Sequence, residues 1–211
     1  MRRLVLCLAL VGGVWTPRGS GAQVLDALVA RVDTEVVTWS RVVQERELLR
    51  LGGARAAELT AEAVRETLVR RHLLVAEARK LRLEVSGAEA REDVEVLVRA
   101  AGGEAFWERA GRLGLDRAQL EERAARQLLV RRYQELRREM TFVPESEVRT
   151  FFFEQTSLPE ESSLADVRDE IRTHLAERKY REELERWIRR QVAEGRVEWL
   201  TLPQEMEDPA G

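Results

Sequence analysis

The chain has 211 residues, of which 44% are hydrophobic and 35% are charged. This length allows one domain, with or without an additional arm, and the composition excludes both a disordered chain and a multi-span membrane protein. The formal net charge of −3 excludes a globally basic nucleic-acid-binding protein, so we expect no nucleic-acid partner.

The first 22 residues have the outline of a secretory signal. Two arginines at positions 2–3 precede an apolar run at 4–14, and small residues at 20–22 offer a cleavage site. The run is too short to cross a bilayer, which takes about 20 residues; an uncleaved interfacial anchor is the alternative. We expect a mature chain in the periplasm or another extracytoplasmic space, without stable membrane insertion. Cleavage also removes Cys7, the only cysteine, so the mature chain forms no disulfide.

The start of the mature chain predicts a hairpin followed by a helix. Within residues 28–38, valines stand on both sides of a polar tip at 33–35, and β-branched residues favour strands. Ser40 is a suitable N-cap for a helix that continues to about Arg50. The glycine pair at 52–53 then ends that helix.

Capping residues and apolar periodicity predict six further helices. They begin at Thr60, at Ser86 with Glu89 three positions on, near Phe106, at Asp116 with Gln119 three positions on, at Pro144 and at Ser163. The last is the longest and ends at Gly195. Residues 196–200 alternate polar and apolar side chains as a strand does, and the simplest arrangement pairs them with the N-terminal hairpin.

These elements predict a mainly α protein with one multi-helix domain over residues 23–202. The small β-element consists of the N-terminal hairpin and a C-terminal strand, and a long C-terminal helix precedes that strand. Residues 155–162 are predicted to be a polar linker. Residues 203–211 are predicted to be a disordered acidic tail.

Five segments, in this order, resemble the N-terminal chaperone domain of the SurA family of periplasmic folding factors. No single motif is diagnostic, and the resemblance lies in their order and spacing. The segments are ALVARVDTEVVTWS at 27–40, LVRRHLLVAEARKLRLEVSGAE at 68–89, LGLDRAQLEERAARQLLVRR at 113–132, VPESEVRTFFF at 143–153 and LADVRDEIRTHL at 164–175. The resemblance implies a helical, SurA-like chaperone involved in outer-membrane protein assembly.

The sequence departs from this family between the last two segments. Many relatives carry one or two parvulin-type prolyl isomerase domains there, whereas this chain has only residues 155–162. A domain needs at least about 50 residues. The resemblance therefore implies the chaperone module without the isomerase domain.

We predict no catalytic residues, no metal site and no cofactor. The two histidines, His72 and His174, lie on different predicted helices and lack metal-ligand spacing. The glycine pairs lack the strand–loop–helix context of a phosphate-binding loop. The many carboxylates lie three or four positions from arginines, which is typical of solvated ion pairs on helix surfaces.

Aromatic side chains are the candidate binding residues. Phe151, Phe152 and Phe153 fan over about 200° of one helix, whereas a core-facing stripe spans about 100°. At least one ring must therefore leave the primary core, either to pack on a second element such as the long C-terminal helix or to line an exposed groove. With Trp107 and Phe142, these residues are the candidate peptide-binding set. Trp39, Phe106 and Trp187 present the same choice between core and surface.

The favoured prediction is an ATP-independent holdase that binds unfolded or extended segments of exported proteins. It would do so by burying apolar side chains, with no covalent chemistry and no fixed client sequence. One alternative is a structural or assembly partner, either a homodimer or a subunit for one dedicated protein. The other is a prolyl isomerase by family association, which the missing domain disfavours.

Overall fold

The computed structural model describes residues 26–154 and 163–203. The predicted signal segment at 1–22, the predicted linker at 155–162 and residues 204–211 of the predicted tail lie outside the described residues. The described part contains seven α-helices, three strands and one short 3₁₀ turn. The elements are β1 Leu28–Val32, β2 Glu35–Thr38, α1 Trp39–Leu51, a 3₁₀ turn Ala56–Glu58, α2 Ala61–Lys80, α3 Gly87–Ala100, α4 Glu104–Arg112, α5 Arg117–Glu139, α6 Glu145–Glu154, α7 Leu164–Ala193 and β3 Val197–Trp199.

The mainly helical fold and the mixed origin of its sheet are both confirmed. The sheet is antiparallel with strand order β2-β1-β3, so the C-terminal strand pairs with the first strand of the N-terminal hairpin. Asp33 lies in the hairpin turn at φ 52°, a left-handed conformation that Asp tolerates better than most residues. Its N–H donates to the carbonyl of Arg196 over 2.8 Å, which joins the turn to the start of β3.

The predicted cap of the first helix is wrong. The N-cap is Thr38 and α1 begins at Trp39, so Ser40 is already the second helical residue. The capping acceptor comes from Asp26, whose carboxylate accepts the N–H of Ser40 at 3.0 Å and also its hydroxyl. Because β2 runs directly into α1, no loop residue is left to cap the helix, and a side chain from before β1 takes that role.

The other predicted caps are confirmed. Thr60 accepts the N–H of Ala63 at the start of α2. Ser86 with Glu89, and Asp116 with Gln119, form capping boxes at the starts of α3 and α5. Ser163, which was predicted only as the start of the longest helix, forms a third box with Asp166 at the start of α7. Each box joins residues three positions apart, which explains why the sequence alone located these helix starts.

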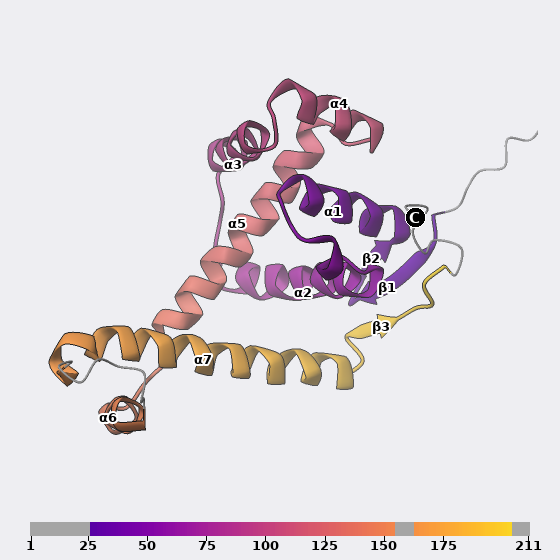
Figure 1. Cartoon of the computed structure of the whole chain (residues 1–211). Helices are drawn as coiled ribbons and strands as arrows, with labels where there is room; N and C mark the ends of the chain where they lie inside the picture. Colours follow the sequence, from indigo (N-terminus) through magenta and orange to yellow (C-terminus); the bar gives the residue numbers. More distant parts are fainter. Residues whose placement is uncertain (1–25, 155–162, 204–211) are drawn as a thin grey trace, which may run out of the picture.

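The body of the molecule has two main hydrophobic clusters. One joins the sheet, α1 and α2, and its fully buried members include Val29 and Leu73; Trp187 of α7 packs against its edge. The other joins α1, α3, α4 and the start of α5 around Phe106, which has no exposed surface. Figure 1 shows α5 running diagonally from α4 past α2 to α7, so α5 links the two ends of the molecule.

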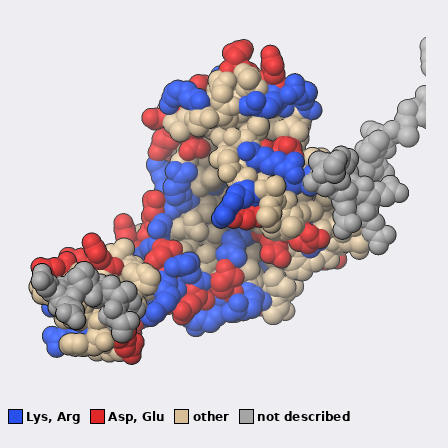
Figure 2. Space-filling view, viewed as in Figure 1, with Lys and Arg blue, Asp and Glu red and all other residues tan. Residues whose placement is uncertain are grey.

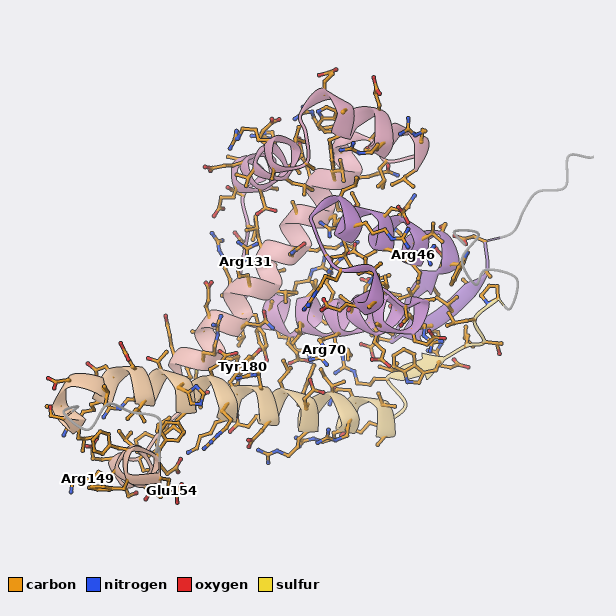
Figure 3. The ribbon with its side chains drawn as sticks, viewed as in Figure 1. Arg46, Arg70, Arg131, Arg149, Glu154 and Tyr180 are labelled. Atoms are coloured by element: carbon orange, nitrogen blue, oxygen red, sulfur yellow. The ribbon has the colours of Figure 1, made fainter. Side chains whose placement is uncertain are left out.

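The helix α6 and the N-terminal half of α7 form an arm that projects from this body (Figure 1). The arm has its own small core of Val143, Val148, Ile171 and Leu175. The C-terminal half of α7 continues from the arm to the body, where Tyr180 and Leu184 pack with Leu74 of α2. Figure 3 shows Tyr180 at the junction where α5 ends against α7. The long helix thus joins the arm to the body.

Candidate peptide-binding surface

The most exposed large hydrophobic side chains of the described residues all lie on or beside the arm. Phe153 is 80% exposed, Phe142 78% and Met140 66%. Phe142 and Met140 lie in the connection between α5 and α6, and Phe153 lies in the last turn of α6. Burying a Phe side chain contributes about 1.5–3 kcal/mol, so the apolar surface left open at these positions, before α6 and in its last turn, is available for binding.

Ion pairs and a small core fix α6 against α7. Glu145 accepts from Arg172 of α7 at 2.8 Å, and Lys179 donates to Glu147 at 2.8 Å. Val148 is fully buried in the same small cluster as Ile171 of α7. The Nζ of Lys179 also lies 3.3 Å from the carbonyl oxygen of Phe142, so the backbone before α6 is held while its ring stays exposed.

The three consecutive phenylalanines of α6 divide as their helical spacing requires. Phe151 and Phe152 are partly buried against α7, and the ring of Phe151 lies 5.2 Å from that of His174 between centroids. Arg178 lies 5.9 Å from the same ring of Phe151. Phe153 points away from this core but meets Phe152 edge-on, with 5.5 Å between ring centroids. The predicted departure of one ring from the core is confirmed.

Trp107 lies elsewhere. It is on α4, at the end of the molecule opposite the arm (Figure 1), where it is partly buried beside Phe106. The guanidinium of Arg117 lies 4.8 Å from its ring centroid. The structure therefore places Phe142 just before α6 and Phe151–Phe153 within α6, and it separates Trp107 from all four. Trp39 is buried in the core of the body, whereas Trp107 and Trp187 are only partly buried.

The body also contains a buried carboxylate that was not among the residues predicted from the sequence. Glu45 of α1 is only 4% exposed, and its two oxygens accept four hydrogen bonds, from Arg71 of α2 and Arg123 of α5, over 2.7 to 3.1 Å. Burial by itself raises the pKa of Glu45, but these hydrogen bonds outweigh burial and lower the pKa to about 2. The available signal was the position of Glu45 between Val42 and Leu48, in phase with the apolar side of α1.

Charges of both signs are mixed over the face seen in Figure 2, and uncharged atoms are exposed at the end of the arm. In Figure 3, Arg149 and Glu154 of α6 extend from the outer side of the arm.

Within residues 26–154 and 163–203, every helix is too short or too polar to span a bilayer. Among those same residues, no cluster of three or more His, Asp and Glu side chains has the arrangement of a metal site.

Comparison with known proteins gives no family. No protein-family model matches the sequence, and no curated protein matches it. The resemblance to the SurA family therefore stays a prediction, carried by the residues quoted above.

Proposed function

We propose that this protein is an extracytoplasmic, ATP-independent chaperone that holds unfolded or extended segments of exported proteins. One observation carries the proposal: the most exposed aromatic side chains, Phe142 and Phe153, lie on or beside an arm that projects from the body. The order of SurA-like segments and the predicted signal segment support the same function.

The arm suits a client without a defined sequence. Exposed phenylalanine rings bind apolar side chains by burial, which is not directional and so does not select one sequence. Charged residues such as Arg149 and Glu154 lie on the same helix as Phe153 and extend from the arm (Figure 3), and they help to keep the free protein soluble. We therefore expect weak, broad binding of clients that expose apolar segments, and release as clients bury those segments.

The test is suppression of aggregation by the mature chain, residues 23–211. Insulin is reduced with dithiothreitol and light scattering is recorded with the chaperone in few-fold excess. The reductant does not react with the mature chain, because the only cysteine of the full sequence, Cys7, lies in the predicted signal segment. We expect a clear reduction in scattering by the unaltered chain, and loss of most of that reduction in the double variant Phe142→Ser, Phe153→Ser.

A matched control removes the same kind of surface elsewhere. Leu81 and Val96 are 50% and 52% exposed on the body, and the double variant Leu81→Ser, Val96→Ser should suppress aggregation as well as the unaltered chain. Equal activity of the arm variant and the control would place client binding outside the arm. Failure of the unaltered chain to suppress aggregation, together with capture of one stoichiometric partner, would replace the proposal with a dedicated assembly role.

A further inference from the structure

A cavity of about 380 Å³ lies between β2 and helices α1, α2 and α5, at the small end of the range of ligand pockets. Each helix lines it with side chains at helical spacing. From α1 these include Arg41 and Glu45, from α2 Arg71 and from α5 Arg123 and Arg126. The cavity is distinct from the aromatic arm, which lies at the end of the molecule beyond α5.

The cavity has more N–H donors than its own carboxylates can accept. Four arginines line it, against the three carboxylates Glu35, Glu45 and Glu122. Arg71 and Arg123 each donate two hydrogen bonds to Glu45, and a guanidinium group has five N–H donors. Arg41 makes no hydrogen bond or ion pair within the described part of the chain. The cavity is therefore suited to one further carboxylate.

Arg126 is the second arginine with spare capacity. Its Nη2 donates to Glu122 at 2.7 Å, whereas its Nη1 lies 3.9 Å from Glu35 and 3.5 Å from the Nε2 of His72. These two longer contacts leave Nη1 free to turn toward an incoming anion. Arg126 is 32% exposed at its side chain, so it is open to a ligand from solvent.

The same cavity runs along the free edge of the sheet. Residues Thr34 to Val37 line it, and β2 pairs only with β1 in the described sheet. Leu200 donates to Val29, and Asp33 donates to Arg196, so the odd-numbered residues of β1 direct their backbone groups to β3. Val36 is opposite one of these, Arg31. Its N–H and C=O therefore point away from β1, toward the open side.

The cavity also has apolar lining. Val37, Leu48, Leu68 and Leu115 contribute to it, and all four are buried. An open strand edge, an apolar lining and surplus guanidinium donors occur together in one place. One kind of ligand offers the matching groups at once, namely the C-terminal end of a polypeptide, with its extended backbone, its last side chains and its terminal carboxylate.

We propose that this cavity binds the C-terminal residues of client polypeptides, as an added strand along β2 with the terminal carboxylate at Arg41 and Arg126. The inference rests on the proposed chaperone function and deepens it, because it gives clients a second, end-specific site besides the aromatic arm. Arg71, Arg123 and Glu45 form the fixed wall of the site. The alternation of strand side chains directs every second client side chain toward the apolar lining.

The test compares two peptides on the full mature chain. A fluorescein-labelled octapeptide of alternating Ser and Val carries either a free C-terminal carboxylate or a C-terminal amide, and binding is followed by fluorescence anisotropy. We expect the carboxylate peptide to bind at least about tenfold more tightly, a difference of about 1.4 kcal/mol. The variant Arg41→Gln, Arg126→Gln should remove that preference and leave the affinity for the amide peptide unchanged.

Two further variants separate charge from strand pairing. Arg55→Gln, Arg181→Gln removes the same charge at well-exposed positions, 84% and 63%, and should keep the preference. Val36→Pro removes an N–H that the hairpin does not use, so it should weaken both peptides while thermal unfolding shows an intact fold. If Val36→Pro unfolds the chain, the variant Arg41→Gln, Arg126→Gln alone tests whether the cavity binds the terminal carboxylate.

Several outcomes would overturn the inference. Equal affinity for the two peptides would do so, as would equally tight binding of an amidated peptide with an internal glutamate. Self-association that the arginine variant abolishes would assign the cavity to a second copy of the chain. Loss of peptide preference with normal suppression of insulin aggregation would refute this site alone, whereas absence of both activities would also refute the chaperone function.

Discussion

Arg196 binds Asp33 through two parallel hydrogen bonds, with 2.9 Å from Nε to Oδ1 and 2.7 Å from Nη2 to Oδ2. The two residues are 163 positions apart, and their contact joins the tip of the N-terminal hairpin to the start of β3. The hydrogen bond from Arg196 lowers the pKa of Asp33. The N-terminal hairpin and β3 are therefore held together by an ion pair in addition to the backbone pairing of β1 with β3.

The variant Arg196→Met should lower the free energy of unfolding by about 1 kcal/mol, because a partly exposed two-point ion pair contributes at the upper end of surface pairs. Urea denaturation of the mature chain measures the loss. Arg31→Met is the matched control, since Arg31 and Glu198 pair across the same strands at 47% and 51% side-chain exposure. Equal losses for the two variants would show that the contact of Arg196 with Asp33 has no special role.

The variant Glu45→Gln should lower the free energy of unfolding by about 3–5 kcal/mol, because it leaves Arg71 and Arg123 without a buried counter-charge. Glu122→Gln is the control, with a carboxylate 55% exposed on α5, and should change stability by no more than about 0.5 kcal/mol. Urea denaturation at pH 7 compares the two. If the Glu45→Gln variant were as stable as the control, the ion pairs of Glu45 with Arg71 and Arg123 would not stabilise the fold.

The same glutamate predicts a pH dependence. The pKa of Glu45 is lowered from 4.5 in the unfolded chain to about 2 in the folded one. Its contribution is therefore fully present above pH 4.5 and is lost as the pH falls toward 2. The stability difference between the unaltered chain and Glu45→Gln should shrink over this window. A difference that stays constant from pH 5 to pH 2.5 would contradict the lowered pKa.

His72 predicts a second pH dependence at milder pH. Burial lowers the pKa of His72 below 6.5, against a smaller opposing effect of its hydrogen bond to Leu68 and of Glu35. Because the unfolded chain takes up a proton first, His72 costs stability as the pH falls below 6.5. His72→Gln removes this proton uptake, so its stability relative to the unaltered chain should rise as the pH falls from 7 to 5.5. Denaturation at both pH values measures the change, and a flat difference would refute it.

The arm should open independently of the body when its core is weakened. Val148→Ala removes two carbon atoms from a fully buried site, at a cost of about 2 kcal/mol. Amide hydrogen exchange should then become faster in α6 and in residues 164–175. The amides of α2, which lies in the body, should keep their rates. Equal acceleration in α2 would show that arm and body unfold as one unit.

Features set by neighbouring residues were predictable from the sequence. The capping boxes at Ser86, Asp116 and Ser163 join residues three positions apart, so the sequence shows both partners together. The arrangement of Phe151–Phe153 followed from helix geometry, because consecutive side chains are 100° apart. The alternation of residues 196–200 predicted β3, and its pairing with the hairpin was the simplest way to satisfy an edge strand.

Only the tertiary structure decided what distant residues do together. Asp26 replaces Ser40 as the source of the first cap because β2 leads straight into α1. Glu45 is buried because Arg71 and Arg123 reach it from 26 and 78 positions away. The sequence thus determined the elements and their order, since those depend on local hydrogen bonds and periodicity. The isolation of the aromatic arm and the arginine-lined cavity depend on how whole helices pack, which no short segment encodes.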